Sequence, residues 1–117
     1  MSIEIFKHST DFESFAAGAT IFKEGDDPAG QMYVLQAGEI DIEIGGKHIN
    51  TLNAGDCLGE IALVDAGPRS ATAVARTDVR LVAIDRKRFI YLVTQTPHFA
   101  LQVMQAMAER LRSRTEH

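Results

Sequence analysis

A mainly β fold with flanking helices is the fold class that this sequence predicts. Segment 39–44 (EIDIEI) alternates isoleucine with acidic residues, which is the pattern of a strand with one buried face. Short segments of this kind recur between Gly-containing turns as far as Asp85, and this spacing is typical of a β-sandwich or barrel. Beyond Asp85 the apolar residues recur at intervals of three and four positions, which indicates helices.

Two hairpins are expected in the first half of the chain. Gly45-Gly46 joins segment 39–44 to KHINTL at 47–52, and Ala37-Gly38 turns MYVLQAGEI at 32–40 back on itself in the same way. Further strands are expected in TIFKEGD (20–26), ATAVAR (71–76) and VRLVAID (79–85). The first of these runs into a turn at Gly25-Asp26, and another turn is expected at NAGD (53–56).

Helices are expected at both ends of the chain. The N-terminal segment 3–15 predicts a short helix or two turns, with phenylalanines that cover one end of the barrel: Phe6, Phe12 and Phe15. At the other end, Pro97 separates two helical patterns. The second pattern carries an apolar stripe, wide enough to pack on the barrel and to meet a partner helix, at residues four apart: Phe99, Val103, Met107 and Leu111.

Length and charge restrict the class of function. The 117 residues predict one domain over 1–117, with the barrel at about 18–85 and the C-terminal helices at about 86–114. The net charge of −4 argues against nonspecific nucleic-acid binding and against an anionic membrane surface. A single cysteine, Cys57, excludes an internal disulfide, and with no signal peptide we expect a cytoplasmic protein.

Neither catalytic residues nor metal ligands are expected. The four histidines are scattered without the spacing of a metal site, and Ser70 has no histidine near it in sequence to activate it. The acidic turn at 24–27 lacks the ligand spacing of a calcium loop. We therefore expect a binding protein that is not an enzyme and has no cofactor.

Segment 59–73 (GEIALVDAGPRSATA) holds the candidate binding residues. Gly59 lets a ligand approach the backbone, and the EIAL turn after it presents helix N–H groups that suit an anion. Arg69 offers paired donors to phosphate oxygens, with the Ser70 hydroxyl beside it. A phosphate repels the Glu60 carboxylate. The arrangement is tolerable if Arg69 balances the charge and if the carboxylate accepts a hydrogen bond from a hydroxyl, such as the ribose 2′-OH of a cyclic nucleotide. The alternative is that Glu60 and Arg69 form only a structural salt bridge.

Segment 59–75 resembles the phosphate-binding cassette of the cyclic nucleotide-binding domain family, which includes bacterial catabolite activator proteins and the regulatory subunits of cyclic AMP-dependent protein kinase. The positions that match the family pattern are Gly59, Glu60, Ala62, Leu63, Pro68, Arg69, Ala71 and Thr72. Segments 37–39 (AGE), 55–56 (GD) and 97–112 also fit, so the resemblance covers essentially the whole chain.

The resemblance implies an eight-stranded jelly-roll barrel with flanking helices and a cyclic nucleotide inside it. The phosphate is then expected on Gly59, Glu60, Ile61 and Ala62 and on Arg69, Ser70 and Ala71. Ile42 and Ile49 are expected to face the base, and the end of the last helix, Arg112 to Thr115, to approach it. Serine after the arginine is similar to bacterial cyclic AMP receptors, whereas threonine is more typical of cyclic GMP-selective members. We therefore favour cyclic AMP, with cyclic GMP as the alternative.

Bacterial regulators of this family continue past the long helix into a DNA-binding domain, for which this sequence has no matching segment. The resemblance thus implies a standalone sensor that acts through its C-terminal helices on a second copy or a partner protein, without nucleic acid or membrane. The alternative is a scaffold or interaction module that keeps the fold and binds no ligand.

Overall fold

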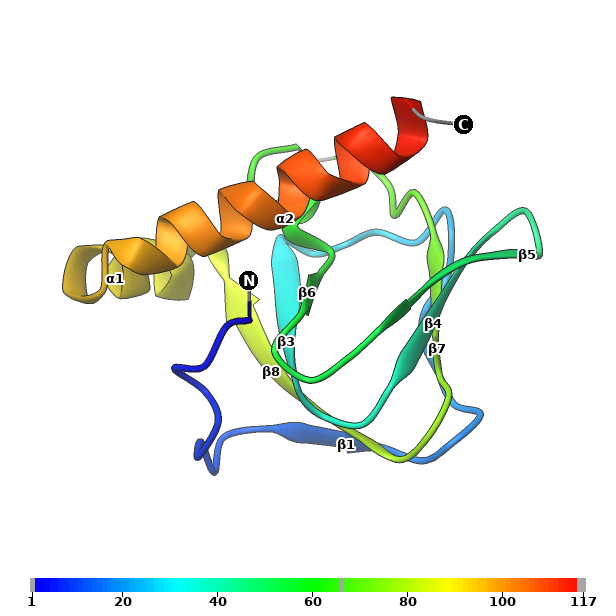
Figure 1. The fold of residues 1–117 in the computed structure, drawn as a ribbon, viewed down its shortest axis with the longest axis horizontal. Helices are drawn as coiled ribbons and strands as arrows, with labels where there is room; N and C mark the ends of the chain where they lie inside the picture. The colour runs from blue at the N-terminus through cyan, green and yellow to red at the C-terminus, as the bar shows by residue number, and fades with distance from the viewer. Residues whose placement is uncertain (1, 66, 116–117) are drawn as a thin grey trace.

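The computed structural model describes residues 2–65 and 67–115, with side chains as far as Arg112. The described residues form two four-stranded antiparallel sheets followed by two helices (Figure 1). The elements are β1 (Glu13–Phe15), β2 (Thr20–Phe22), β3 (Gln31–Ala37), β4 (Ile40–Ile44), β5 (Lys47–Leu52), β6 (Cys57–Leu58), the 3₁₀ turn η1 (Glu60–Leu63), β7 (Thr72–Ala75), β8 (Val79–Asp85), α1 (Arg86–Gln95) and α2 (His98–Thr115).

The strand order is β1-β8-β3-β6 in one sheet and β2-β7-β4-β5 in the other. Strands from the two halves of the chain pair as β1 with β8, β2 with β7, β3 with β6 and β4 with β5. This pairing arises when one long hairpin is wrapped into a barrel, which is the jelly-roll arrangement. The predicted mainly β fold with C-terminal helices is therefore confirmed.

One predicted hairpin is confirmed and the other is wrong. β4 and β5 pair across Gly45-Gly46, with Ile40 opposite Leu52. β3 and β4, however, lie in different sheets, so residues 32–40 form no hairpin. The reason lies in the backbone of Glu39, whose carbonyl accepts from Arg76 N at 2.9 Å and whose N–H donates to the Thr77 hydroxyl at 3.0 Å. The chain crosses between the sheets at this corner instead of folding back.

Of the two alternatives for the N-terminal segment, the helix is wrong and the turns are confirmed, because residues 2–12 contain turns and no helix. Lys7 N donates to Glu4 O and Ser9 N donates to Phe6 O. Each of these bonds closes a single turn between residues three positions apart, and neither turn continues into a helix. The side-chain amide of Gln36 donates to the carbonyls of Phe6 at 2.8 Å and Ser9 at 2.7 Å, which occupies groups that a longer helix would use. The chain then enters β1 at Glu13, ahead of the position where the barrel was expected to begin.

Two buried clusters fill the molecule. One lies within the barrel and contains Leu35, Ile40 and Leu81. The other lies between the barrel and the helices, where Phe99 of α2 contacts Phe6 and Phe89 with ring centroids 6.1 and 5.6 Å apart. The N-terminal half of α2 is thereby anchored to the barrel by apolar contacts.

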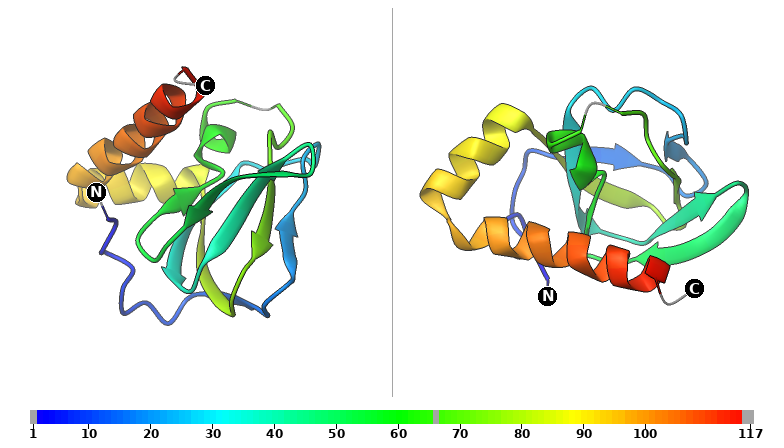
Figure 2. Two further views of the ribbon diagram at one scale, coloured as in Figure 1. Left: turned by 45° about the vertical axis from the view of Figure 1, so that its right-hand side comes forward. Right: turned by 90° about the horizontal axis from the view of Figure 1, so that it is seen from above.

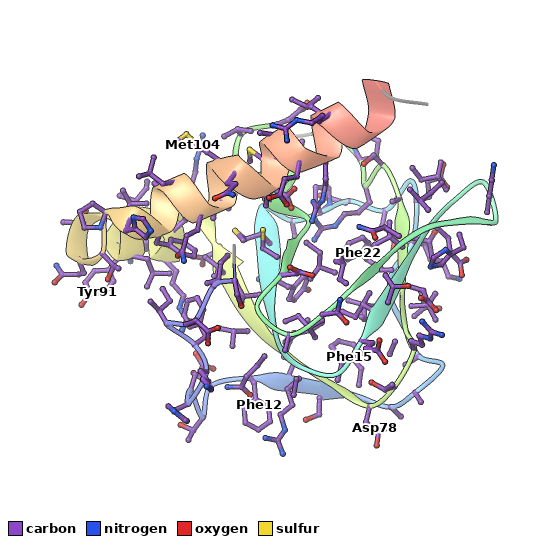
Figure 3. The ribbon with its side chains drawn as sticks, in the orientation of Figure 1. Phe12, Phe15, Phe22, Asp78, Tyr91 and Met104 are labelled. Atoms are coloured by element: carbon purple, nitrogen blue, oxygen red, sulfur yellow. The ribbon has the colours of Figure 1, made fainter. Side chains whose placement is uncertain are left out.

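The C-terminal half of α2 continues beside the mouth of the barrel. Seen from above, it runs along one side of the mouth while η1 lies on the other (Figure 2). The outward side chains of α2 include Met104, which lies in its N-terminal half, points away from the barrel and is 54% exposed (Figure 3). Within the described residues, neither helix has the length and apolar character that crossing a membrane requires.

Candidate functional site

A cavity of about 560 Å³ opens between the barrel, η1 and the C-terminal half of α2. This volume lies in the range of small-molecule pockets, about 300–1,000 Å³. All nine residues proposed from the sequence line it: Ile42, Ile49, Gly59, Glu60, Ile61, Ala62, Arg69, Ser70 and Ala71. The fold therefore brings the predicted residues together around one space.

Gly59 shapes the loop that enters this cavity. It precedes η1 with φ +73°, a left-handed conformation that glycine adopts without strain. A side chain here is also excluded by space, because a Cβ atom would collide with the guanidinium of Arg69. The Gly59 carbonyl accepts from Ala62 N and from Arg69 Nη1, both at 3.2 Å. The sequence pair of glycine and arginine is thus a direct contact in the fold.

Arg69 is held on the barrel wall from several directions. Its side chain donates through Nη2 to the Gln31 carbonyl at 2.8 Å and through Nη1 to the Gly59 carbonyl. Its backbone N–H donates to Asp26 O, and its carbonyl accepts from Gly25 N, both at 2.8 Å. The residue is only 8% exposed. These bonds use two of the five N–H donors of a guanidinium, so donors remain for an anion in the cavity.

Burial lowers the pKa of Arg69 from its usual value, while Tyr33, Asp26 and Glu60 act in the opposite direction. An arginine side chain remains charged under such conditions because its reference pKa is so high. A nearly buried cation that lines a cavity favours an anionic ligand, since the anion restores the charge balance that water otherwise provides.

Glu60 is fully buried, and its two carboxylate oxygens differ in environment. Oε1 forms an ion pair with Arg110 of α2. Oε2 has no hydrogen-bond partner among the described residues, although it is shielded from solvent. The ion pairs of the described residues do not include one between Glu60 and Arg69, so the simple salt bridge considered from the sequence is not formed. Because a buried acceptor without a donor is unfavourable, this oxygen suits a ligand hydroxyl.

Sequence reasoning missed Arg110. The C-terminal basic run looks like a solvated face, but Arg110 lies 11 positions after Phe99 and seven after Val103, which places it on the buried side of α2. It donates through Nη1 to Glu60 and through Nη2 to the carbonyl of Cys57. The helical period of the apolar stripe was the signal that could have identified it.

The remaining walls of the cavity are largely apolar. Ile42 and Leu52 come from the β4–β5 hairpin, and Ala106 and Met107 come from α2. Ile49 also lines the cavity, at the rim, where it is 48% exposed. At the end of α2, Leu111 lines the cavity and Arg112 does not, while the side chains of residues 113–115, also expected near a base, lie outside the described part of the structure. Such walls suit a flat, weakly polar group.

Cys57 lies at the edge of this site as a buried thiol. Burial, followed by the nearby Glu60 carboxylate, raises its pKa to about 12, against a smaller opposite effect of Arg110. The thiol is therefore protonated near neutral pH and is a poor nucleophile. Within residues 2–65 and 67–115, no group of His, Cys, Asp and Glu side chains is placed to hold a metal ion. The chemistry that this site offers is binding of an anion and a hydroxyl.

The amino-acid sequence is similar to those of two curated relatives. The chain is 40% identical over 79 residues to the cAMP-dependent protein kinase regulatory subunit of Colletotrichum orbiculare, a match that covers 66% of this chain and 20% of that protein. It is 31% identical over 103 residues to the CRP-like cAMP-activated global transcriptional regulator of Mycobacterium tuberculosis, which covers 84% of this chain and 46% of that protein. The chain thus spans less than half the length of either relative.

Among solved structures, the catabolite activator protein of Thermus thermophilus is similar in fold, with a TM-score of 0.76 and 30% identity over 91% of this chain and 53% of that one. The family model of the cyclic nucleotide-binding domain matches residues 12–96, which include every described strand, η1 and α1. The chain therefore belongs to the cyclic nucleotide-binding domain family.

Proposed function

We propose that the cavity binds a 3′,5′-cyclic nucleotide, with cyclic AMP preferred over cyclic GMP, and that occupancy is sensed by α2. The observation that carries this proposal is that Arg69 and Glu60 line the same cavity, and that Oε2 of Glu60 is buried there without a hydrogen-bond partner among the described residues. One offers donors to an anion and the other offers an acceptor to a hydroxyl. A cyclic nucleotide presents both groups on one rigid ring system.

In this proposal the phosphate lies between Arg69 and the η1 loop. The free N–H groups of the guanidinium bind two phosphate oxygens, as its planar fork favours. Backbone N–H groups of Ile61 and Ala71, together with the Ser70 hydroxyl, complete the cradle, and all three residues line the cavity. Gly59 keeps this approach free of a side chain.

The ribose 2′-OH donates to Oε2 of Glu60. Arg110 compensates part of the Glu60 charge through Oε1, which reduces the repulsion between this carboxylate and the phosphate. Arg110 also fixes the orientation of the carboxylate, so that Oε2 and not Oε1 is available. Glu60 therefore distinguishes a ribose from a deoxyribose.

The base lies against Ile42 and Ile49, below α2. The preference for cyclic AMP is supported by Ser70 directly after Arg69 and by the similarity to two relatives whose names describe cAMP dependence. Cyclic GMP is the alternative ligand. The domain carries out no chemistry on the nucleotide in this proposal, and it works in the cytoplasm.

Sensing follows from the position of Arg110. A ligand that engages Glu60 changes the contact through which the C-terminal half of α2 is tied to the barrel, and so favours one arrangement of that helix. The outward face of α2, with Leu101, Met104 and Leu111 each more than half exposed, would then bind or release a second copy or a partner protein.

Calorimetric titration of the nucleotide-free protein tests the proposal. Cyclic AMP is expected to bind at micromolar or lower concentration and more tightly than cyclic GMP. The 2′-deoxy form of cyclic AMP is expected to bind more weakly to the parent, and Glu60→Gln is expected to reduce this difference. Equal affinity for the two forms in the parent would reject the role of Glu60.

Hydrogen exchange across α2 with and without cyclic AMP tests the sensor part separately. Altered protection in the C-terminal half of α2 is the expected result. If neither cyclic nucleotide binds and neither raises the thermal stability, the scaffold alternative applies, in which the exposed face of α2 is the functional surface. Concentration-dependent association that a charged substitution of Met104 abolishes would support that alternative.

A further inference from the structure

Phe22 lies against the guanidinium of Arg69. It is the last residue of β2, it lines the cavity, and the centroid of its ring lies 4.2 Å from the guanidinium carbon. The ring of Tyr33 on β3 also stacks on Phe22, with centroids 6.4 Å apart and an interplanar angle of 23°. Because β2 and β3 belong to different sheets, this aromatic pair joins the two sheets beside Arg69.

We propose that Phe22 is a positioning residue that fixes the plane of the Arg69 guanidinium, so that its remaining N–H groups face the bound phosphate. This inference rests on the proposed function of the cavity. It adds Phe22, from the N-terminal part of the chain and outside segment 59–75, to the residues that determine anion affinity.

The two carbonyl contacts of Arg69 do not fix this plane by themselves. Gln31 O holds Nη2 and Gly59 O holds Nη1, which leaves the guanidinium free to tilt about the line that joins the two nitrogens. Contact with the face of the Phe22 ring removes that freedom, because a guanidinium packs well parallel to an aromatic face. An aliphatic side chain would fill the same space without attracting the cation.

The burial of Arg69 increases the importance of the ring. The residue is 8% exposed, so little water stabilises its charge before a ligand arrives. The negative face of an aromatic ring provides part of that stabilisation, and such contacts are strongest when water is excluded. Phe22 therefore stabilises the cation and keeps it oriented before a ligand binds.

Calorimetry on Phe22→Leu and Phe22→Tyr tests the inference. Phe22→Leu is expected to weaken cyclic AMP binding about 3- to 30-fold, the range of a partly to fully desolvated cation–π contact. Phe22→Tyr keeps the ring face and is expected to bind within about twofold of the parent. Phe15→Leu is the matched control: Phe15, the last residue of β1, packs on the same barrel cluster but does not line the cavity.

A second measurement separates positioning from general packing. In the unliganded protein, the Arg69 Nε–H proton resonance, assigned by its loss in Arg69→Lys, is expected to be shifted upfield by the Phe22 ring and to lose that shift in Phe22→Leu but not in Phe15→Leu. In an Arg69→Lys background, Phe22→Leu is expected to change affinity less than in the parent. An unchanged Arg69 resonance in Phe22→Leu, or equal losses of affinity in Phe22→Leu and Phe15→Leu, would overturn the inference.

Failure of the proposed function is distinguishable from failure of this inference. If the parent binds neither cyclic AMP nor cyclic GMP, the proposed function fails, while the Arg69 resonance of the unliganded protein still supports or rejects the role of Phe22. If the parent binds and Phe22→Leu binds equally well, the proposed function stands and the role of Phe22 is rejected.

Discussion

Two arginines reach one cavity from two regions of the molecule, and they are held in different ways. Arg69 belongs to the barrel wall, is 8% exposed and donates to the main-chain carbonyls of Gln31 and Gly59. Arg110 belongs to α2, has a side chain that is 33% exposed and contacts the carboxylate of Glu60 and the carbonyl of Cys57. The sheets fix the partners of Arg69, whereas Arg110 meets its partners only while α2 keeps its place.

This difference assigns recognition of the ligand to the barrel and the response to the ligand to α2. The barrel side presents its donors before a ligand arrives, which reduces the entropy lost on binding. The helix side makes polar contacts at its C-terminal half, while apolar anchors such as Phe99 and Val103 hold its N-terminal half. A ligand that changes the Glu60 contact can therefore release or tighten one half of α2 without disturbing the other.

The largest expected effect is that of Arg69→Ala. Removal of a buried cation that faces an anion typically costs about 2–5 kcal/mol, so cyclic AMP affinity is expected to fall about 30-fold or more in calorimetry. Arg80→Ala is the matched control, because Arg80 also lies over a phenylalanine, with its guanidinium carbon 4.9 Å from the Phe12 ring centroid, but outside the cavity. Equal affinities of Arg69→Ala and the parent would show that the barrel side is not the anion site.

Gly59→Ala is expected to have the next largest effect. A left-handed alanine costs about 1–2 kcal/mol, and the new methyl group also displaces the Arg69 guanidinium. Gly18→Ala provides the control, because Gly18 has φ +89° and open space around it. Both variants are expected to lower the urea midpoint, but only Gly59→Ala is expected to lower cyclic AMP affinity, by about tenfold or more. Normal binding by Gly59→Ala would mean that Arg69 tolerates displacement.

Arg110→Gln tests the helix side of the comparison. The substitution removes the charged partner of the buried Glu60, and the free energy of unfolding is expected to fall by about 1–2 kcal/mol, discounted for the partial exposure of Arg110. Amide exchange in the C-terminal half of α2 is expected to accelerate while exchange near Phe99 is unchanged.

Arg76→Gln, at an exposed arginine after β7, controls for loss of charge alone. A uniform acceleration of exchange along α2, or none, would contradict the division of that helix into two halves.

The sequence predicted those parts of the fold that depend on local pattern. The alternation around Ile40, Ile42 and Ile44 located β4, and the helical repeats on either side of Pro97 located α1 and α2. Local pattern does not specify pairing partners, however. The turn at Ala37-Gly38 therefore predicts a hairpin, although contacts of Glu39 with residues 76–77 carry the chain into the other sheet.

The same limit applies to the candidate site. The cassette residues were predictable because glycine, glutamate and arginine stand at short spacing within one segment, 59–75. Phe22 and Arg110 lie 47 and 41 positions from Arg69 along the chain. Only the folded barrel and α2 bring Phe22 into contact with Arg69, and Arg110 into contact with Glu60. The N-terminal helix failed for a related reason, because the carbonyls of Phe6 and Ser9 bond to the distant Gln36.

The smallest expected effect concerns Cys57, which lies where the two regions meet, because its carbonyl accepts from Arg110. Its thiol has an ordinary pKa of 9.0 when exposed and a pKa raised to about 12 in the fold. The unfolded chain therefore loses this proton at lower pH than the folded chain. The resulting stability is complete below about pH 9 and is lost as the pH rises toward 12, by up to about 1.4 kcal/mol per pH unit.

Urea unfolding at pH 8, 9 and 10 on the parent and on Cys57→Ala measures this effect. Other groups titrate in this range in both proteins, so the informative quantity is the difference between the two slopes of unfolding free energy against pH. The parent is expected to lose more stability than Cys57→Ala between pH 9 and 10, by about 1 kcal/mol. Identical slopes would show that the thiol is as accessible to water as in the unfolded chain, and that the contact between α2 and the barrel over Cys57 is open in solution.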